Sequence, residues 1–267
     1  MTALPAPTAP VRFRTARDSA LIAGRNLRVL RKNPGRMVYP LVQPAVLLVM
    51  FVSVFGNLAL TGHAAAAGAY RQFLIPGIIV QNATLTAPVT GLALLRDSSS
   101  GLADRFRSLP MSRAAVLSGR AASDAVVFAA QAAALLAVAT PLGFRVSGGL
   151  PGYAAITGIT VVFGLALAVL SGWFALLLGD PETAERVLFF PAIALSFISS
   201  AFAPVNDLAG WMQPVARVTP ATEAAAVIRS LAAGGPLAIP LLELGIWLAA
   251  LILIPGTLAA RRWNSPR

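Results

Sequence analysis

Residues 153–178 read YAAITGITVVFGLALAVLSGWFALLL, a run of 26 residues without a single charged side chain. A helix needs about 20 mostly apolar residues to cross about 30 Å of hydrocarbon. The run is long enough to span a bilayer, and it therefore predicts a transmembrane helix in the middle of the chain.

Apolar runs of similar character recur on both sides of this segment. They cover approximately residues 37–60, 73–95, 121–144, 187–203 and 237–260. With residues 153–178 they predict an all-α polytopic membrane protein with six transmembrane helices, whose transmembrane domain extends from 34 to 262.

The overall composition supports a membrane protein and excludes several other classes. Hydrophobic residues make up 57% of the chain and charged residues 12%, whereas soluble domains carry about 25% charged residues. The formal net charge is +11, but a soluble nucleic-acid-binding protein would not combine that charge with so few charged residues. We therefore expect no nucleic acid partner.

The positions of the cations predict the orientation of the chain. Eight Lys and Arg residues precede the first run, five lie between the second and third runs, one lies between the fourth and fifth, and three follow the sixth. Only Arg71, Arg145, Arg217 and Arg229 fall on the other side. Because cytoplasmic loops are rich in Lys and Arg, both termini are predicted to be cytoplasmic.

The segment before the first run has two parts. Residues 1–13 are predicted to be disordered, since Pro, Ala and Thr dominate them. Residues 14–33 predict an amphipathic interfacial helix, whose basic arc includes Arg25, Arg28, Arg31 and Lys32. This helix is either a simple positive-inside anchor or an element that also contacts a cytoplasmic partner. At the opposite end, residues 263–267 are predicted to form a cytoplasmic tail.

The loop between the second and third runs predicts a short helix. Leu102, Phe106 and Leu109 recur at spacings of four and three residues, so they share one helical face. The charged residues beside this face are Asp104, Arg105 and Arg107. So small an apolar face cannot form a core, and it docks either on the spans or on another protein.

The fifth run is short, and the segment after it is broken by prolines. Residues 204–236 include Pro204, Trp211, Pro214 and Pro220 but no stretch long enough to cross a bilayer. They predict either short interfacial or re-entrant helices on the outer side or an ordinary extracellular loop.

Few polar side chains interrupt the spans. Gln43, Gln81, Asn82 and Gln131 are candidates either for a translocation path or for polar contacts between helices. Asp124 and Glu243 are the ionisable residues in the runs. Asp124 lies four residues after Arg120, which predicts a salt bridge along one helix.

The sequence lacks the usual catalytic patterns. It contains no Gly-x-x-x-x-Gly-Lys-Ser/Thr motif to hold nucleotide phosphates, no Cys, and a single His. The acidic residues Asp180, Glu182 and Glu185 surround Pro181, and they fit the negatively charged start of a helix. We therefore expect a chain that is not an enzyme and binds no metal.

Three stretches together resemble the type-2 ABC exporter permeases, and most closely the daunorubicin-type drug-resistance permeases. The first is RFRSLPMSR at 105–113, followed by Gly119-Arg120 and Asp124. The second consists of Phe190-Pro191, FISSAFAP at 197–204, WMQP at 211–214, Pro220-Ala221-Thr222, Arg229 and GGP at 234–236. The third is Arg25-Asn26-Leu27 with Gln43-Pro44. The resemblance covers the chain from about Arg17 to Arg262.

The resemblance implies roles for the segments above. Residues 101–109 would be the coupling helix that seats in a separate ATP-binding subunit, and the amphipathic helix would be the connecting helix beside it. The segment with Phe202, Pro204 and Trp211 would form re-entrant helices of an outer gate.

The resemblance also implies partners and a location. Two ATP-binding subunits would carry ATP and Mg²⁺, so that this chain binds no cofactor, and a second permease copy or a homologue would complete the pathway in a bacterial plasma membrane. Membrane lipids would surround it. The expected cargo is an amphipathic drug, a natural product or a lipid-like molecule. The alternatives are export of a lipid-linked glycan or envelope lipid and, less favoured, an intramembrane lipid-modifying enzyme or a secondary transporter.

Overall fold

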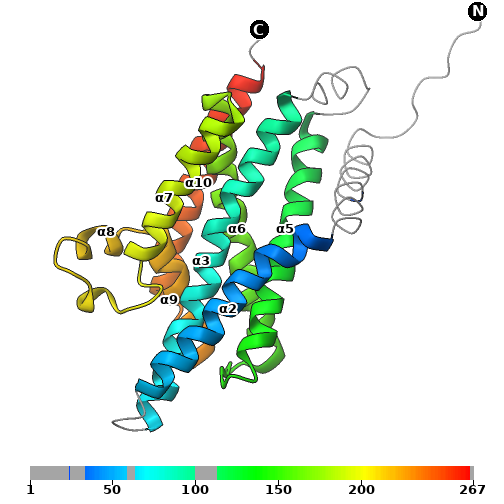
Figure 1. The fold of residues 1–267 in the computed structure, drawn as a ribbon. Helices are drawn as coiled ribbons and strands as arrows, with labels where there is room; N and C mark the ends of the chain where they lie inside the picture. The colour runs from blue at the N-terminus through cyan, green and yellow to red at the C-terminus, as the bar shows by residue number, and fades with distance from the viewer. Residues whose placement is uncertain (1–23, 25–33, 59–63, 100–112, 265–267) are drawn as a thin grey trace, which may run out of the picture.

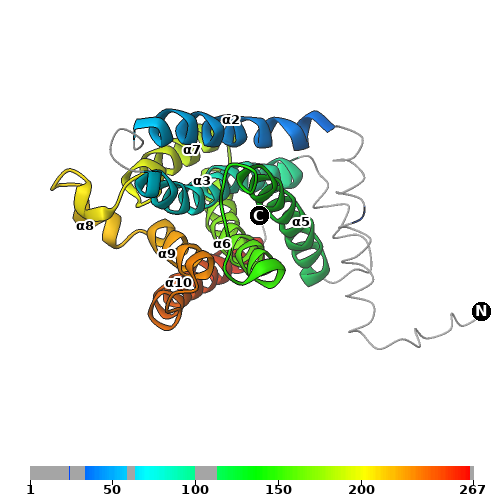
Figure 2. The same cartoon turned by 90° about the horizontal axis from the view of Figure 1, so that it is seen from below.

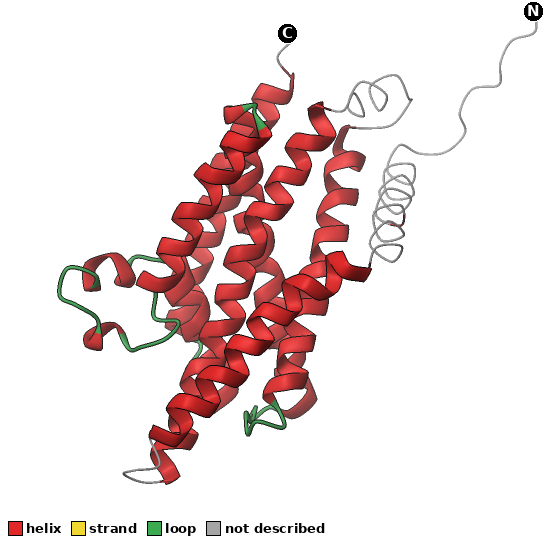
Figure 3. Ribbon diagram, viewed as in Figure 1, coloured by secondary structure: helices red, strands yellow, loops and turns green. Residues whose placement is uncertain are grey.

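The structure is a computed structural model, and it describes residues 24, 34–58, 64–99 and 113–264. These residues form helices joined by loops, with no strand in the described ranges (Figure 3). The helices, in chain order, are α2 (Pro34–Leu58), α3 (Ala64–Ser99), α5 (Arg113–Ala139), α6 (Gly149–Leu178), α7 (Pro181–Ile198), η2 (Val205–Asp207), α8 (Gln213–Arg217), α9 (Pro220–Ala233) and α10 (Ala238–Asn264).

The long helices run side by side, while α2 crosses the others at an angle (Figure 1). Viewed from below, α3 and α6 lie in the middle, with α2 along one side and α9 and α10 along the other (Figure 2). The α3 helix packs against α2, α5, α6, α7 and α9, and its most extensive contact is with α6. The α6 helix likewise packs against five helices, so α3 and α6 together connect the bundle.

Burial differs sharply between the helices. In the most apolar stretches, 72% of α3 is buried, compared with 33% of α6 and 17% of α10. The α3 helix also carries buried polar side chains, among them Gln81, Asn82 and Thr86. A helix with polar groups is costly to expose to hydrocarbon, so the polar helix lies inside and the apolar helices surround it.

Within the part of the chain that the structure describes, four helices are long and apolar enough to cross a membrane: α3, α5, α6 and α10. The α2 helix has a shorter apolar stretch, Leu41–Val54, and α7 has only 18 residues. The all-α prediction is thus confirmed and four of the six predicted spans are supported by length and composition. Six spans remain a prediction.

Close contact between α3 and α6 depends on glycine. A Cβ added at Gly91 would lie 2.6 Å from the backbone carbon of Ser171. A Cβ at Gly164 of α6 would lie 2.6 Å from the ring of Phe128 in α5. Small residues let helices in membranes approach closely, and here they bring α6 against both neighbours.

The ends of two helices differ from the predicted runs. The α5 helix ends at Ala139, before the predicted boundary at residue 144, because the chain turns after Thr140: the Phe144 N–H donates to the Ala139 carbonyl at 3.1 Å and Gly143 adopts φ of 98°. The α3 helix continues through Arg71 and Arg96, and it contains Pro76 and Pro88. The predicted start of α7 is confirmed, since Asp180 caps the helix by accepting from the Thr183 backbone N–H at 2.8 Å, with Pro181 next.

Candidate functional site

A buried polar cluster joins α3 to α5. The side-chain oxygen of Gln131 accepts from Asn82 Nδ2 at 3.1 Å and from Thr86 Oγ1 at 3.0 Å. All three residues are buried. Two donors from one helix that meet one acceptor on the next fix the register of the two helices, as expected for a polar contact within a membrane.

The other two predicted polar candidates lie elsewhere. Gln81 is buried on α3 beside Asn82, whereas Gln43 is exposed on α2. The four residues therefore do not line one continuous surface, and their part in a translocation path stays a prediction.

Arg120 ties the end of α3 to the start of α5. Its guanidinium donates to Asp97 Oδ2 and to the Thr90 carbonyl, both at 2.7 Å, and it lies 3.6 Å from Asp124 Oδ2. The side chain of Arg120 is only 16% exposed. We call this region of the bundle the Arg120 end. The predicted pair of Arg120 with Asp124 is present, and Asp97 and Thr90 add the connection to the neighbouring helix.

A second ion pair at the Arg120 end reaches α7. Arg96 Nη2 lies 3.5 Å from Glu185 Oε2, and both side chains are more than half exposed. Sequence spacing did not predict either cross-helix pair, since Asp97 and Arg120 are 23 positions apart and Arg96 and Glu185 are 89 apart. The pair between Asp97 and Arg120 has one signal in the sequence. An acidic residue precedes the loop and a basic residue follows it.

The predicted coupling segment enters and leaves the bundle at this end. The α3 helix ends at Ser99 and α5 begins at Arg113. The predicted coupling residues lie between these two positions, outside the described residues: Leu102, Asp104, Arg105, Phe106, Arg107 and Leu109. The predicted residues of the interfacial helix, Arg25, Arg28, Arg31 and Lys32, also lie outside the described residues.

The opposite end of the bundle, which we call the Arg229 end, is held by arginine bonds to carbonyl groups. Arg229 of α9 donates to the Phe73 carbonyl at 3.0 Å, the Ser200 carbonyl at 2.6 Å and Ser200 Oγ at 3.1 Å. Its guanidinium carbon also lies 3.7 Å from the centre of the Phe73 ring. One side chain thus joins α9, α3 and the segment after α7. The sequence predicted only the side of the membrane on which Arg229 lies and its place in the stretch that resembles the permease family.

The predicted gate residues do not share one environment. Phe202 packs between Phe51 of α2 and Phe197 of α7, with ring centroids 5.2 and 5.3 Å away. Pro204 is exposed just before η2, and Trp211 is 71% exposed. Between α7 and α10 the chain forms the short helices α8 and α9, of which α9 is extensively buried against α3, α6 and α10. Whether these helices re-enter the membrane stays a prediction.

Acidic and metal-ligating groups are sparse in the bundle. Within residues 34–58, 64–99 and 113–264, no three His, Cys, Asp or Glu side chains lie close enough to hold a metal ion. The polar features of these residues are the contacts between helices described above, at Gln131, Arg120, Arg96 and Arg229.

Comparison with known proteins identifies the family. The model of the ABC-2 type transporter family matches residues 19–232. The daunorubicin resistance ABC transporter permease protein DrrB1 of Streptomyces coeruleorubidus is 27% identical over 252 residues, covering 94% of this chain and 85% of that protein. A Mycobacterium tuberculosis protein named "Probable doxorubicin resistance ABC transporter permease protein DrrC" is 30% identical over 215 residues, covering 80% of this chain and 76% of that protein.

These matches confirm the resemblance drawn from the sequence motifs. The family match spans most of the chain, and both relatives are named as permeases. The apolar helices fit that role. The chain belongs to the ABC-2 type transporter family and is a membrane permease subunit of an ABC exporter.

Proposed function

We propose that this permease exports an amphipathic drug, natural product or lipid-like molecule from the cytoplasm or the inner leaflet. Two relatives with substantial coverage carry names that refer to daunorubicin and doxorubicin resistance. Large aliphatic and aromatic side chains are exposed on α2, on α10 and on α7 from Val187 onward, which suits a cargo that partitions into the membrane. The similarity to these relatives is the observation that carries the proposal.

A separate ATP-binding subunit supplies the energy in this proposal. The chain has no phosphate-binding loop of its own, so ATP and Mg²⁺ bind to the partner. Two such subunits work with two permease chains, either identical or homologous. Six spans, re-entrant helices α8 and α9, and cytoplasmic termini complete the arrangement.

Movement of the ATP-binding subunit reaches the bundle through residues 100–112. The segment connects α3 with α5, and Arg120 bonds to Asp97 and Thr90 close to both junctions. A force on the segment therefore acts on α3 and α5 as one unit. Because α3 contacts five other helices, its displacement alters the whole bundle.

Transport by the reconstituted complex tests the proposal. The permease and its ATP-binding subunit are placed in liposomes, and ATP-dependent movement of fluorescent doxorubicin is measured. We expect movement that stops when the phosphate-binding lysine of the partner is replaced. Absence of drug movement, together with ATP-dependent movement of a lipid-linked glycan, would contradict the proposed cargo in favour of the alternative.

The double variant Phe106→Ala and Leu109→Ala tests the coupling role separately. Both side chains belong to the predicted apolar docking face. We expect the permease to insert normally while cargo no longer stimulates ATP hydrolysis. A matched control is Leu150→Ala, because Leu150 is 84% exposed at the start of α6 and lies outside this face. Unchanged cargo stimulation in the double variant would show that coupling passes elsewhere.

A further inference from the structure

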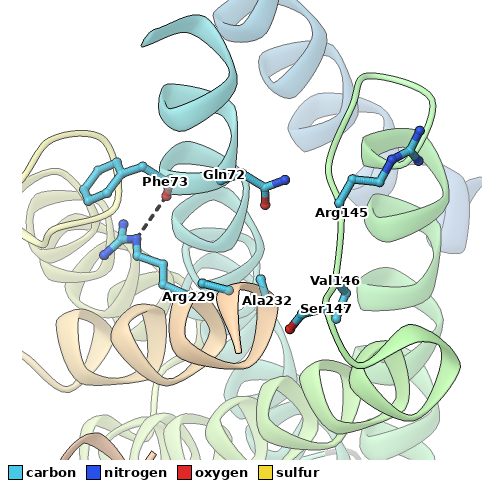
Figure 4. Close-up of a pocket in the computed structure, with 8 residues that line it drawn as sticks. Gln72, Phe73, Arg145, Val146, Ser147, Arg229 and Ala232 are labelled. Carbon is cyan, nitrogen blue, oxygen red and sulfur yellow. Dashed lines mark hydrogen bonds between the residues drawn. The ribbon is translucent and has the colours of Figure 1, made fainter. Parts of the chain in front are cut away.

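A cavity of about 460 Å³ lies at the Arg229 end (Figure 4). Three segments surround it: the start of α3, the connection between α5 and α6, and the last turns of α9. The lining residues are Gln72, Phe73, Arg145, Val146, Ser147, Arg229, Ala232 and Ala233. Its volume falls within the range of about 300–1,000 Å³ that is usual for small-molecule sites.

The position of the cavity corresponds to the boundary between hydrocarbon and headgroups. The candidate spans begin at Gly68 in α3, Gly149 in α6 and Ala238 in α10, and the span in α5 ends at Ala139. Each lining segment lies within several residues of one of these ends. If the helices cross a bilayer, the cavity faces lipid headgroups and the first carbons of their chains.

Positive charge collects around this cavity without matching carboxylates. Arg145 and Arg229 line it, and Arg71 lies beside it, donating to the Leu142 carbonyl at 3.4 Å. Within the described ranges, these three arginines form no ion pair, whereas Arg96, Arg120 and Arg186 at the other end each pair with Asp or Glu. Three of the four arginines predicted on this side are thus gathered around one cavity.

The two arginines that line the cavity differ: Arg229 is bonded within the bundle, and Arg145 is accessible to a ligand. Arg229 is occupied with Phe73 and Ser200, so it contributes mainly charge. Arg145 is exposed at the rim, and Figure 4 shows its guanidinium standing away from Arg229. The connection that carries Arg145 is anchored, because the Ser147 backbone N–H donates to the Ala232 carbonyl at 2.9 Å. Arg145 therefore extends from a fixed backbone and is available to donate to an anion.

We propose that this cavity binds the phosphate of an anionic phospholipid. Arg145 supplies the charged hydrogen bond from the rim, and Arg229 and Arg71 provide further positive charge. Phe73, Val146, Ala232 and Ala233 form an apolar wall for the part of the lipid next to the phosphate. An arginine suits this role because its planar fork matches phosphate oxygens. The proposal does not rest on the transported cargo.

Native mass spectrometry of the full chain in detergent tests the site. The probes are phosphatidylglycerol, phosphatidylcholine and glycerol phosphate, which separate a lipid phosphate from a zwitterionic lipid and from a free phosphate. We expect phosphatidylglycerol adducts that survive activation better than the other two. In Arg145→Gln their affinity should fall by about tenfold, as for loss of one charged hydrogen bond.

Arg217→Gln is the matched control. Arg217 is exposed on α8, lies on the same predicted side of the membrane, and does not line the cavity. Equal loss of adducts in both variants would overturn the proposal, because charge alone would then explain binding. Equal retention of phosphatidylcholine and phosphatidylglycerol, or binding of glycerol phosphate as tight as that of the lipid, would overturn it as well. Thermal unfolding of Arg145→Gln should match the parent protein, since the side chain is exposed.

Discussion

Arginine side chains hold both ends of the bundle together, but their partners differ. At the Arg120 end, Arg120 and Arg96 bind the carboxylates of Asp97, Asp124 and Glu185, and the Thr90 carbonyl is the one backbone partner of Arg120 among the described residues there. At the Arg229 end, Arg229 and Arg71 bind the backbone carbonyls of Phe73, Ser200 and Leu142.

The difference has a physical consequence for movement. Carboxylate partners are side chains that can rotate, exchange with water and respond to salt. Backbone carbonyl partners move only with their helices. The carboxylate links at the Arg120 end can therefore break and form again as helices shift, whereas the links at the Arg229 end require α3, α9 and the segment after α7 to move together.

The largest expected effect is from Arg229→Ala. The substitution removes three hydrogen bonds and leaves the carbonyl of buried Ser200 and that of partly buried Phe73 without this donor. We expect a loss of about 3 kcal/mol or more in the free energy of unfolding, since each unsatisfied buried group costs 1–3 kcal/mol. Denaturation in detergent measures it, with Arg217→Ala as the control. Stability equal to that of the control would show that the Arg229 end is not locked by this side chain.

Arg120→Ala is expected to have a smaller effect on stability and a distinct effect on activity. The charged hydrogen bonds to Asp97 and Thr90 are worth about 2 kcal/mol together in a partly exposed site. A double-mutant cycle with Asp97→Asn separates the ion pair from the Thr90 bond. ATP hydrolysis by the complex should continue while transport falls. If transport and hydrolysis fell in equal proportion, the residue would act on stability alone.

Asp180→Ala removes the cap of α7 at the Arg120 end, with an expected loss smaller than that of Arg120→Ala. Hydrogen bonds from Thr183 hold the pKa of Asp180 below its ordinary value of 3.8. A depressed pKa means that the contribution is complete above the ordinary pKa and is lost as pH falls through the folded pKa. The difference in unfolding free energy between the parent and Asp180→Ala should therefore be larger at pH 7 than at a pH below the folded pKa of Asp180. A constant difference at both pH values would contradict this.

The smallest effect is expected from Arg96→Ala. Its pair with Glu185 is exposed and 3.5 Å long, and exposed pairs contribute about 0.5 kcal/mol or less. The effect should disappear at high salt, because mobile ions screen the pair. If the loss of unfolding free energy persisted at high salt, the pair of Arg96 and Glu185 would be as insensitive to ions as the carbonyl bonds of the Arg229 end.

The sequence predicted the apolar helices well and the cross-helix contacts poorly. The uncharged run at residues 153–178 lies within one helix, α6, and Pro181 correctly marked the start of α7. The ends of α3 were missed because Arg71 and Arg96 interrupt the apolar run, although the helix continues through both. The early end of α5 depends on a local turn at Thr140 that hydropathy does not record.

The site contacts required three-dimensional information for a different reason. Asn82 and Gln131 were recognised as candidates because polar residues in membrane helices are rare, whereas Arg120 was predicted only as the partner of Asp124. Their partners lie on helices that are distant in the chain, so spacing could not reveal them. Arg229 was missed as a structural residue because its partners are backbone carbonyls, which leave no trace in the sequence.

Pro76 and Pro88 divide α3 into three sections that can bend relative to one another. A proline has no N–H to donate, so the helix lacks one backbone bond at each position and bends there more easily. The buried polar cluster with Asn82 and Thr86 lies on the section between the two prolines, which its bonds to α5 hold in place. Beyond Pro88, the arm to Ser99 is roughly 16 Å long, so that a bend of about 10° displaces its tip by about 3 Å. Such a displacement is comparable to the length of the bond between Arg120 and Asp97 near the tip of the arm, so a small angular change at Pro88 is enough to break that bond.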